Sequence, residues 1–307
     1  MIILYVFIVL LAIILIFSAI TYKIVFRKSK KDNNIYNIPE GKDYQQKKDM
    51  FINLIDNFNK ISYEDVYIKS HDGLNLHARY YHIKDSAPLN ICFHGYRATS
   101  TRDFCGGIKM CFDNGHNVLL IDERAHGKSD GKAITFGIKE RYDCLDWINY
   151  AINRFPSSKI LLYGISMGAA TILMASNLIT SNNVVGIIAD CPYSSPSKII
   201  KKVCKDMKLP PNLVFPFIYL GGLIYGRFNL NESSAIESVK DCKIPILIMH
   251  GKNDSFVPSK MSKEIKTNAT SDLKLVLFPN AEHGLSYIVD ENKYRKNVQD
   301  FLKKVLN

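Results

Sequence analysis

The chain has 307 residues, of which 47% are apolar and 22% charged, a composition that excludes disordered and fibrous classes and is typical of a globular protein. Its seven cysteines are scattered without a C-x-x-C pair, so neither a disulfide framework nor a zinc site is predicted. Lysine and arginine exceed aspartate and glutamate by 11 (40 against 29), but no nucleic-acid-reading motif accompanies this excess, and no nucleic-acid partner is expected.

The first predicted element is an apolar helix at the N-terminus. Residues 2–20, IILYVFIVLLAIILIFSAI, contain no charged side chain. At the rise of an α-helix they are long enough to cross a hydrocarbon core of about 30 Å. A cleaved signal peptide is the alternative, but it would have a basic n-region, a shorter apolar stretch and a small-x-small cleavage site. We therefore predict a transmembrane anchor over residues 1–22.

A basic flank follows this anchor. Residues 1–48 hold eight lysines and arginines against three acidic residues, so they carry +5 of the net charge of +11. Because the positive charge lies only on the C-terminal side of the anchor, the positive-inside rule predicts a single-pass protein with its catalytic domain in the cytoplasm; an extracytoplasmic domain is the alternative. Residues 23–60, polar and aperiodic over 27–50, are interpreted as a juxtamembrane tether whose lysines contact anionic lipid head groups.

The next elements are strands. Residues 63–70 and 74–81 alternate around Asp72-Gly73 and predict an antiparallel hairpin. Short, unbroken apolar runs of the kind buried on both faces of a parallel sheet then follow at 89–93, 117–121, 159–163, 184–189, 244–249 and 273–278. Segments with helical periodicity, such as 137–155, lie between them. This order predicts an α/β fold over residues 61–307, with a mostly parallel central sheet and antiparallel N-terminal strands.

One interval is too long for a simple crossover. About fifty residues separate the strand ending near Asp190 from the next, which predicts a small helical cap insertion at about 191–240. Its first part, 197–208, carries a lysine stripe that we interpret as a solvated helix face, with lipid contact as the alternative. Its second part, 213–225, is apolar but too short and too interrupted to span a bilayer, and is either a lid over a pocket or core packing.

The octapeptide YGISMGAA, residues 163–170, joins an apolar run to a helix-like run. This is the strand, sharp turn and helix arrangement of a nucleophile elbow. Such a turn drives the serine toward positive φ and brings strand and helix so close that residues two positions before and after must be small. Gly164 and Gly168 meet this requirement, and Ser166 is the predicted nucleophile.

A serine nucleophile needs a base that is itself oriented by an acid, and in this arrangement both follow the serine in the chain. Asp254 lies in the loop after the run 244–249, and His283 lies in the loop after 273–278. The C-terminal ends of parallel strands share one edge of a sheet, so we expect Ser166, Asp254 and His283 to converge. Asp190, which also ends a strand after Ser166, is the rival acid.

The loop after the run 89–93 is the predicted oxyanion loop. There His94-Gly95-Tyr96 brings backbone close to the serine, and the N–H groups of Tyr96 and Met167 are the predicted oxyanion donors. We interpret His94 as a structural histidine that braces this loop.

The loop 122–131 is interpreted as a turn held by three polar side chains, Arg124, His126 and Ser129. The other histidines lack metal-ligand spacing, and no P-loop or dinucleotide fingerprint is present. No metal and no cofactor are therefore expected.

Five motifs, FHGYRATS, DERAHGKSDG, YGISMGAA, HGKNDSFVP and NAEHG, occur in one order between about residues 62 and 305. In these motifs the chain resembles the α/β-hydrolase superfamily, specifically bacterial membrane-anchored hydrolases similar to serine aminopeptidases and monoacylglycerol lipases. The resemblance implies a serine hydrolase, and we expect it to cleave a carboxylic ester of a lipid-like or apolar small molecule. A peptidase, a thioesterase or an acyltransferase with the same triad is the alternative, as is a non-catalytic membrane-anchored binding scaffold.

Overall fold

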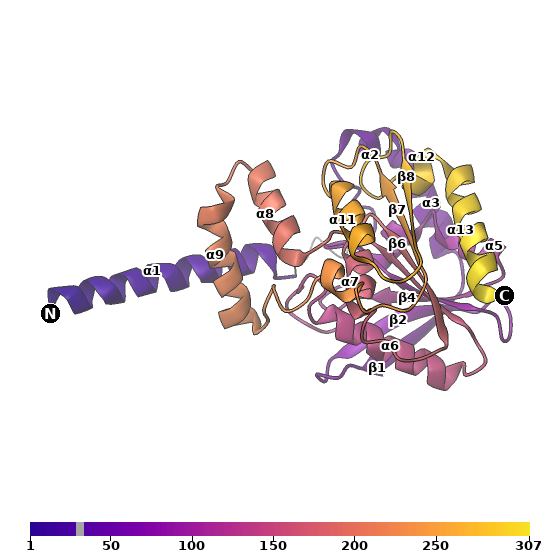
Figure 1. The fold of residues 1–307 in the computed structure, drawn as a ribbon, viewed down its shortest axis with the longest axis horizontal. Helices are drawn as coiled ribbons and strands as arrows, with labels where there is room; N and C mark the ends of the chain where they lie inside the picture. The colour runs from indigo at the N-terminus through magenta and orange to yellow at the C-terminus, as the bar shows by residue number, and fades with distance from the viewer. Residues whose placement is uncertain (29–33) are drawn as a thin grey trace.

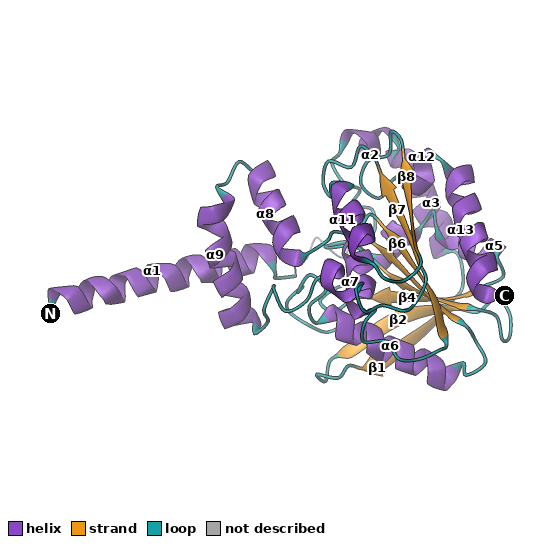
Figure 2. Ribbon diagram, in the orientation of Figure 1, coloured by secondary structure: helices purple, strands orange, loops and turns teal. Residues whose placement is uncertain are grey.

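The computed structural model describes residues 1–28 and 34–307, and its centre is an eight-stranded sheet between two layers of helices (Figures 1 and 2). The strand order is β1-β2-β4-β3-β5-β6-β7-β8. The strands are β1 Glu64–Lys69, β2 Asn75–Tyr81, β3 Leu89–Phe93, β4 Asn117–Asp122, β5 Ile160–Ile165, β6 Val184–Asp190, β7 Ile246–Gly251 and β8 Leu273–Phe278.

The sheet changes from antiparallel to parallel along its width. β1 pairs with β2 and β2 with β4 in antiparallel fashion, and every pairing from β4 through β3, β5, β6 and β7 to β8 is parallel. The continuous apolar runs of β3, β4 and β7 are buried along their whole length. The predicted parallel sheet with antiparallel N-terminal strands is confirmed.

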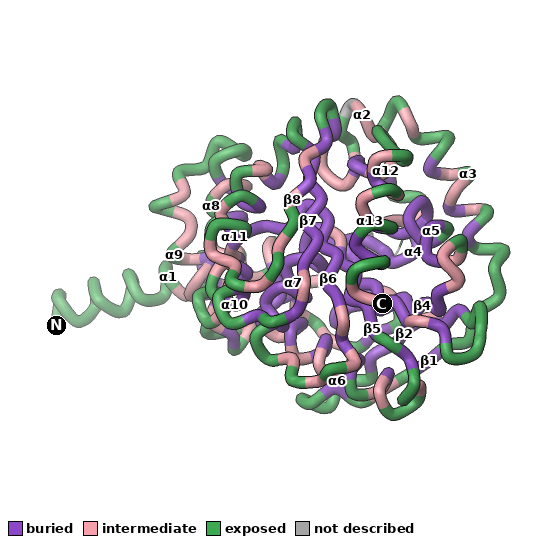
Figure 3. Tube along the Cα trace, turned by 45° about the vertical axis from the view of Figure 1, so that its right-hand side comes forward, coloured by how far each residue is buried: buried purple, intermediate pink, exposed green. Residues whose placement is uncertain are grey.

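Two hydrophobic clusters fill the space between the sheet and its helices. One cluster contains side chains of α6 (Glu140–Arg154), α7 (Met167–Ala175) and α11 (Lys260–Asn268). The other contains side chains of α4 (Ser100–Phe104), α5 (Ile108–Asp113) and α13 (Glu291–Leu306), while α12 (Ser286–Val289) precedes α13. The sheet is therefore the buried centre of the molecule, as its colour in Figure 3 shows.

Helix α1 (Ile2–Val25) projects from the domain, and most of its length is exposed (Figures 1 and 3). Among the described residues it is the one helix long and apolar enough to cross a membrane. Its end enters the domain: Phe26 is fully buried and contacts the rings of Phe136 and Phe228 edge-on. The carbonyl of Phe26 also accepts a hydrogen bond from the Ile134 N–H at 2.7 Å.

Part of the segment predicted as a tether is helical and packed on the domain. Residues 29–33 of the predicted tether and basic flank lie outside the described residues, but α2 (Lys42–Gln46) and α3 (Lys48–Asn59) pack onto the domain. The side chains of Phe51, Ile55 and Phe58 recur at helical spacing and are buried. The stretch 27–50 ends just before this apolar pattern begins, which is why its polarity alone predicted a linker.

The segment predicted as a cap, about 191–240, contains α8 (Pro196–Asp206), α9 (Pro211–Gly221), the π-helical turn η2 (Gly222–Gly226) and α10 (Ala235–Ser238). In Figure 1, α9 crosses α1, and α8 lies between α9 and the body of the domain. Charged residues are lacking from Pro211 through Gly226. The cap thus brings an uncharged surface against the N-terminal helix.

Candidate active site

Ser166 occupies the sharp turn between β5 and α7. Its backbone has φ +54° and ψ −110°, which a non-glycine residue rarely adopts. A Cβ on Gly164 would lie 2.5 Å from the backbone nitrogen of Ala169, and a Cβ on Gly168 would collide with the carbonyl of Phe93. Both glycines are therefore required by the close approach of strand and helix.

The structure brings the three predicted triad side chains together at the C-terminal edge of the sheet. The Nε2 atom of His283 lies 2.9 Å from Oγ of Ser166, and its Nδ1 atom lies 2.7 Å from Oδ2 of Asp254. Ser166 and Asp254 are buried, and His283 is partly exposed. This geometry makes one hydrogen-bonded chain from the hydroxyl to the carboxylate.

Asp254 is held in place by more than His283. Its Oδ1 atom accepts the N–H groups of Phe256 and Val257 at 3.0 and 2.7 Å, and its Oδ2 atom lies 3.1 Å from Nε2 of His250. Burial would raise the pKa of Asp254, but the charge of His283 and the hydrogen bonds from both histidines outweigh burial and hold that pKa well below its usual range. The carboxylate is thus ionised and oriented.

His250 is a residue of this site that sequence reasoning did not find. It is fully buried at the end of β7, and its Nδ1 atom lies 2.6 Å from Oγ of Ser262. Its Nε2 atom also lies 2.8 Å from the carbonyl oxygen of Val257, so the proton is assigned to Nε2. The signal in the sequence is the position of His250, four residues before Asp254. This spacing indicates a contact only when the loop after β7 is known to fold back so that the two side chains meet.

Asp190, the rival acid, makes different contacts. Its side chain is buried and accepts a hydrogen bond from the hydroxyl of Tyr294 at 3.0 Å, while its backbone carbonyl accepts the N–H of Ser166 at 2.8 Å. Burial raises the pKa of Asp190 to about 6, partly offset by the hydrogen bond from Tyr294. Asp254, and not Asp190, is the carboxylate that contacts His283.

The predicted oxyanion loop lies beside the serine. A Cβ on Gly95 would come within 3.4 Å of the Cβ of Ser166, and the Gly95 N–H donates to Asp103 at 2.8 Å. Met167 is the first residue of α7, so its N–H has no acceptor within the helix and lies at the positive end of the helix dipole. These positions suit the predicted roles of the Tyr96 and Met167 N–H groups, which remain predictions.

The same loop is bonded to the end of α1, a connection that sequence reasoning did not find. The hydroxyl of Tyr96 donates to the carbonyl of Val25 at 2.7 Å. The guanidinium of Arg97 donates to the carbonyls of Ile24 and Arg27 at 2.7 and 3.0 Å. The C-terminal turn of α1 and the predicted oxyanion loop are thus one packed unit.

His94 braces this loop, as predicted. Its Nδ1 atom lies 2.8 Å from the Gly95 carbonyl, and its Nε2 atom accepts the N–H of Glu123 at 3.1 Å. Complete burial lowers the pKa of His94, partly offset by the nearby carboxylates of Asp103 and Asp122. A neutral, fully bonded histidine is suited to a structural role.

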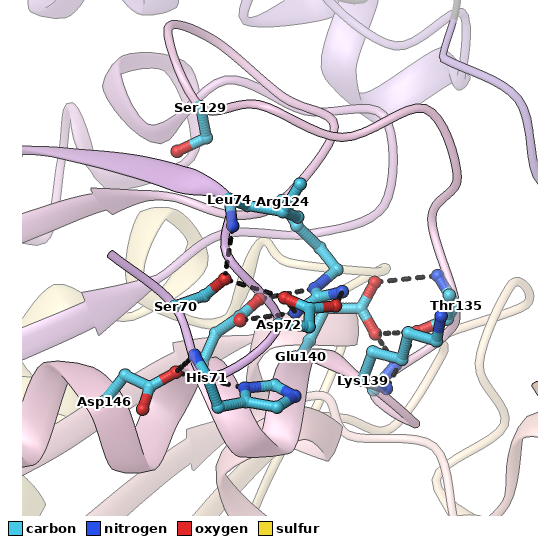
Figure 4. Close-up of polar contacts among 12 residues, drawn as sticks. Ser70, His71, Asp72, Leu74, Arg124, Ser129, Thr135, Lys139, Glu140 and Asp146 are labelled. Atoms are coloured by element: carbon cyan, nitrogen blue, oxygen red, sulfur yellow. Dashed lines mark hydrogen bonds and ion pairs between the residues drawn. The ribbon is translucent and has the colours of Figure 1, made fainter. Parts of the chain in front are cut away.

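The loop after β4 is held by a polar network (Figure 4). The buried guanidinium of Arg124 donates to both carboxylate oxygens of Asp72 at 2.9 and 3.2 Å, and to those of Asp143 at 2.5 and 2.6 Å. The Oγ atom of Ser129 donates to the carbonyl of Asp122 at 2.5 Å, and Nε2 of His126 accepts the Arg97 N–H at 3.1 Å. The predicted turn network is confirmed.

A cavity of about 550 Å³ opens at Ser166 and His283. Its apolar wall includes Tyr44, Ile165 and Phe256, and its polar wall includes Arg102 and Glu282. Tyr44 also donates its hydroxyl to the carbonyl of His283 at 2.8 Å. The N-terminal segment that was predicted as a tether therefore builds part of the site.

Among the residues that the structure describes, two groups of side chains have the spacing to share a metal ion: Cys191 with Asp254 and His283, and His71 with Asp143 and Asp146. In the first group, Asp254 already binds two histidines, and in the second, Asp143 is paired with Arg124. A metal would have to displace these contacts in either place.

Comparison with known proteins identifies the fold. A family model described as alpha/beta hydrolase fold matches residues 91–214, and a model of the dienelactone hydrolase family matches residues 221–306. Together with the sheet order and the serine turn, these matches show that the chain has the alpha/beta-hydrolase fold.

Individual proteins agree with this assignment. The uncharacterized protein YqkD of Bacillus subtilis is 25% identical over 296 residues, which are 95% of this chain and 93% of YqkD. The uncharacterized membrane protein YNL320W of Saccharomyces cerevisiae is 27% identical over 190 residues, 61% of each chain. The esterase Pf2001 of Pyrococcus furiosus superimposes with a TM-score of 0.65 at 24% identity, covering 82% of this chain and 94% of the esterase. The likeness to this solved structure supports the same fold.

Proposed function

We propose that the protein is a serine hydrolase that cleaves a carboxylic ester through an acyl-enzyme intermediate. The observation that carries this proposal is the hydrogen-bonded chain from Ser166 through His283 to Asp254 at the mouth of a cavity. A similar fold in an esterase of Pyrococcus furiosus supports the choice of an ester as substrate.

In this mechanism, Nε2 of His283 takes the proton from Ser166 as Oγ attacks the carbonyl carbon of the ester. The negative oxygen that forms is stabilised by the N–H groups of Tyr96 and Met167. His283 then gives its proton to the leaving alcohol, and the acyl group stays on Ser166. Water attacks the acyl-enzyme with His283 again as base, and the acid product leaves as Ser166 regains its proton. Asp254 keeps the proton of His283 on Nδ1 throughout.

The surroundings of Ser166 favour a lipid-like or other apolar acyl group. The cavity has Tyr44, Tyr96, Ile165 and Phe256 in its walls, and its size suits a small molecule rather than a polymer. A peptidase, a thioesterase or an acyltransferase would use the same first step and differ in leaving group or acceptor. A non-catalytic scaffold is less well supported, because binding alone does not need three side chains in this order.

We propose in addition that residues 1–22, which include most of α1, anchor the protein in a membrane as a single span. The hydrolase domain, residues 61–307 with its cap at about 191–240, then lies on the cytoplasmic side, as the basic flank after α1 predicts.

The test is hydrolysis of p-nitrophenyl esters of increasing chain length by the full chain in detergent. We expect Ser166→Ala and Asp254→Asn each to lower kcat/KM by at least about 10³-fold. Asp190→Asn is the matched control, since it removes a buried carboxylate that does not contact His283, and it should leave kcat/KM within about threefold of wild type. Undiminished turnover by Ser166→Ala would refute the proposal, and products formed with added alcohols or amines would separate hydrolysis from transfer.

A further inference from the structure

The cap carries an apolar surface that is not buried in the domain. We call residues Pro211–Gly226, which form α9 and η2, the apolar cap segment. Its sixteen residues, PNLVFPFIYLGGLIYG, include no charged side chain, yet Leu213, Ile224 and Tyr225 are 64, 45 and 41% exposed. Contiguous exposed apolar surface on a folded domain marks a contact with a partner or a membrane.

This segment packs directly on α1. The hydroxyl of Tyr225 donates to the carbonyl of Leu15 at 3.1 Å, and the ring centroids of Phe17 and Phe217 lie 5.6 Å apart. A Cβ on Gly221 would lie 2.6 Å from the carbonyl oxygen of Ser18, so the two backbones approach as closely as only glycine permits. The apolar cap segment and the second half of α1 are therefore packed directly against each other.

The position of these contacts along α1 indicates where the apolar cap segment lies relative to a bilayer. The contacts run from Leu15 to Tyr22, about 10 Å along the helix axis, and all lie within the predicted membrane anchor. The end of α1 cannot slide away from the domain, because Phe26 is buried in the core and Tyr96 and Arg97 hold the carbonyls of residues 24, 25 and 27. If α1 is in a bilayer, whatever packs on Leu15 and Ser18 is in it too.

We propose that the apolar cap segment is embedded beside α1 in the membrane leaflet next to the domain, so that the protein contacts lipid through two helices rather than one. Because α9 crosses α1 instead of running along it, the segment lies in the plane of the membrane (Figure 1). Its helical backbone satisfies its own polar groups, as the hydrocarbon requires. This proposal rests on the membrane placement of α1 and not on the proposed catalytic activity.

Charge on the neighbouring helix fits this placement. α8 lies between the apolar cap segment and the domain in Figure 1, which is the level of the lipid head groups. Its lysines 198, 201 and 205 are exposed, with Nζ of Lys198 also paired to Glu264 at 2.8 Å, while Ile199 and Ile200 are buried in the larger hydrophobic cluster. The Nζ atom of Lys201 lies 4.5 Å from the ring centroid of Phe215, which joins the basic and apolar layers. Cationic side chains at this level are attracted to anionic lipid.

The experiment places an environment-sensitive nitrobenzoxadiazole label on the full chain in vesicles of phosphatidylglycerol and phosphatidylcholine. The test sites are Leu213→Cys and Ile224→Cys. Ile13→Cys on α1 is the reference within the anchor, and Lys303→Cys on α13 is the reference in water. All seven native cysteines are buried, and the unsubstituted chain gives the background of the labelling reaction.

We expect labels at 213 and 224 to be quenched by nitroxide-bearing lipids nearly as strongly as the label at 13. We also expect aqueous iodide to quench them several-fold less than the label at 303. If the labels at 213 and 224 behave like 303 while 13 lies in lipid, the apolar cap segment is not embedded and the proposal is wrong. If the label at 13 is also open to iodide, α1 is not in the bilayer and the proposal falls with it.

Discussion

At the level of single residues, the candidate site depends on one carboxylate that serves two histidines. Asp254 accepts from Nδ1 of His283 and from Nε2 of His250, and two backbone N–H groups occupy its other oxygen. Each donor stabilises the ionised form that His283 needs when it becomes positive in the reaction. His250 is therefore a positioning residue for the proposed chemistry.

Replacing His250 by glutamine should lower kcat by about ten- to hundredfold, because a hydrogen bond to a buried charge contributes on the order of 1.5–3 kcal/mol. His116→Gln is the matched control: His116 is also buried, but it contacts Asn90 away from the site, so its loss should affect stability and leave kcat unchanged. Ester hydrolysis and thermal unfolding of both variants give the comparison. An unchanged kcat in His250→Gln would show that this histidine does not position Asp254 for the reaction.

Asp190 predicts a pH dependence of stability. Its pKa of about 6 in the folded protein lies above the ordinary value of 3.8, so the folded state binds more protons than the unfolded state between these values. The contribution of Asp190 is fully present below pH 3.8 and is lost as the pH rises through 6, a change of about 3 kcal/mol. Asp190→Asn should thus unfold at a higher temperature than wild type at about pH 8, with a smaller difference at about pH 5. Equal shifts at both pH values would contradict this assignment.

At the level of elements, the regular pattern of strands and the serine turn could be predicted because both depend on local sequence. The glycines around Ser166 are required by backbone contacts that any such turn makes, and strand ends at one edge of a sheet explain why His283 and Asp254 meet there. Contacts between distant segments were not predictable in this way. Tyr44 beside His283, and Arg97 on the end of α1, depend on how the chain packs after its elements have formed.

The junction between α1 and the domain predicts a large difference between two phenylalanines of the N-terminal segment. Phe26→Ala should lower the free energy of unfolding by about 3–5 kcal/mol, because it leaves a cavity between Phe136 and Phe228. Phe7→Ala, at a position 62% exposed on α1, should leave the domain's stability unchanged. Denaturant unfolding of both variants in detergent measures the two effects. A small effect of Phe26→Ala would mean that α1 is only loosely attached.

At the level of the whole molecule, charge predicts how the protein is oriented in a membrane. Lys23, Arg27 and Lys28 follow the apolar stretch of α1. A tag at the C-terminus should therefore be protected from protease added to intact cells and become accessible after lysis. Cleavage in intact cells would place the domain on the outer side. A reporter fused after residue 28 and a reporter fused to the C-terminus of the full chain should both be located on the cytoplasmic side.

In the proposed mechanism, Ser166 is a nucleophile activated by His283 and Asp254. The most direct measurement is reaction of the full chain with a fluorophosphonate probe, followed by mass spectrometry of the labelled peptide. We predict a single adduct on Ser166, lost in Ser166→Ala and strongly slowed in Asp254→Asn, while Asp190→Asn labels at the rate of wild type. An adduct on another residue would contradict the proposed mechanism. So would a folded protein that hydrolyses esters while its Ser166 does not react with the probe.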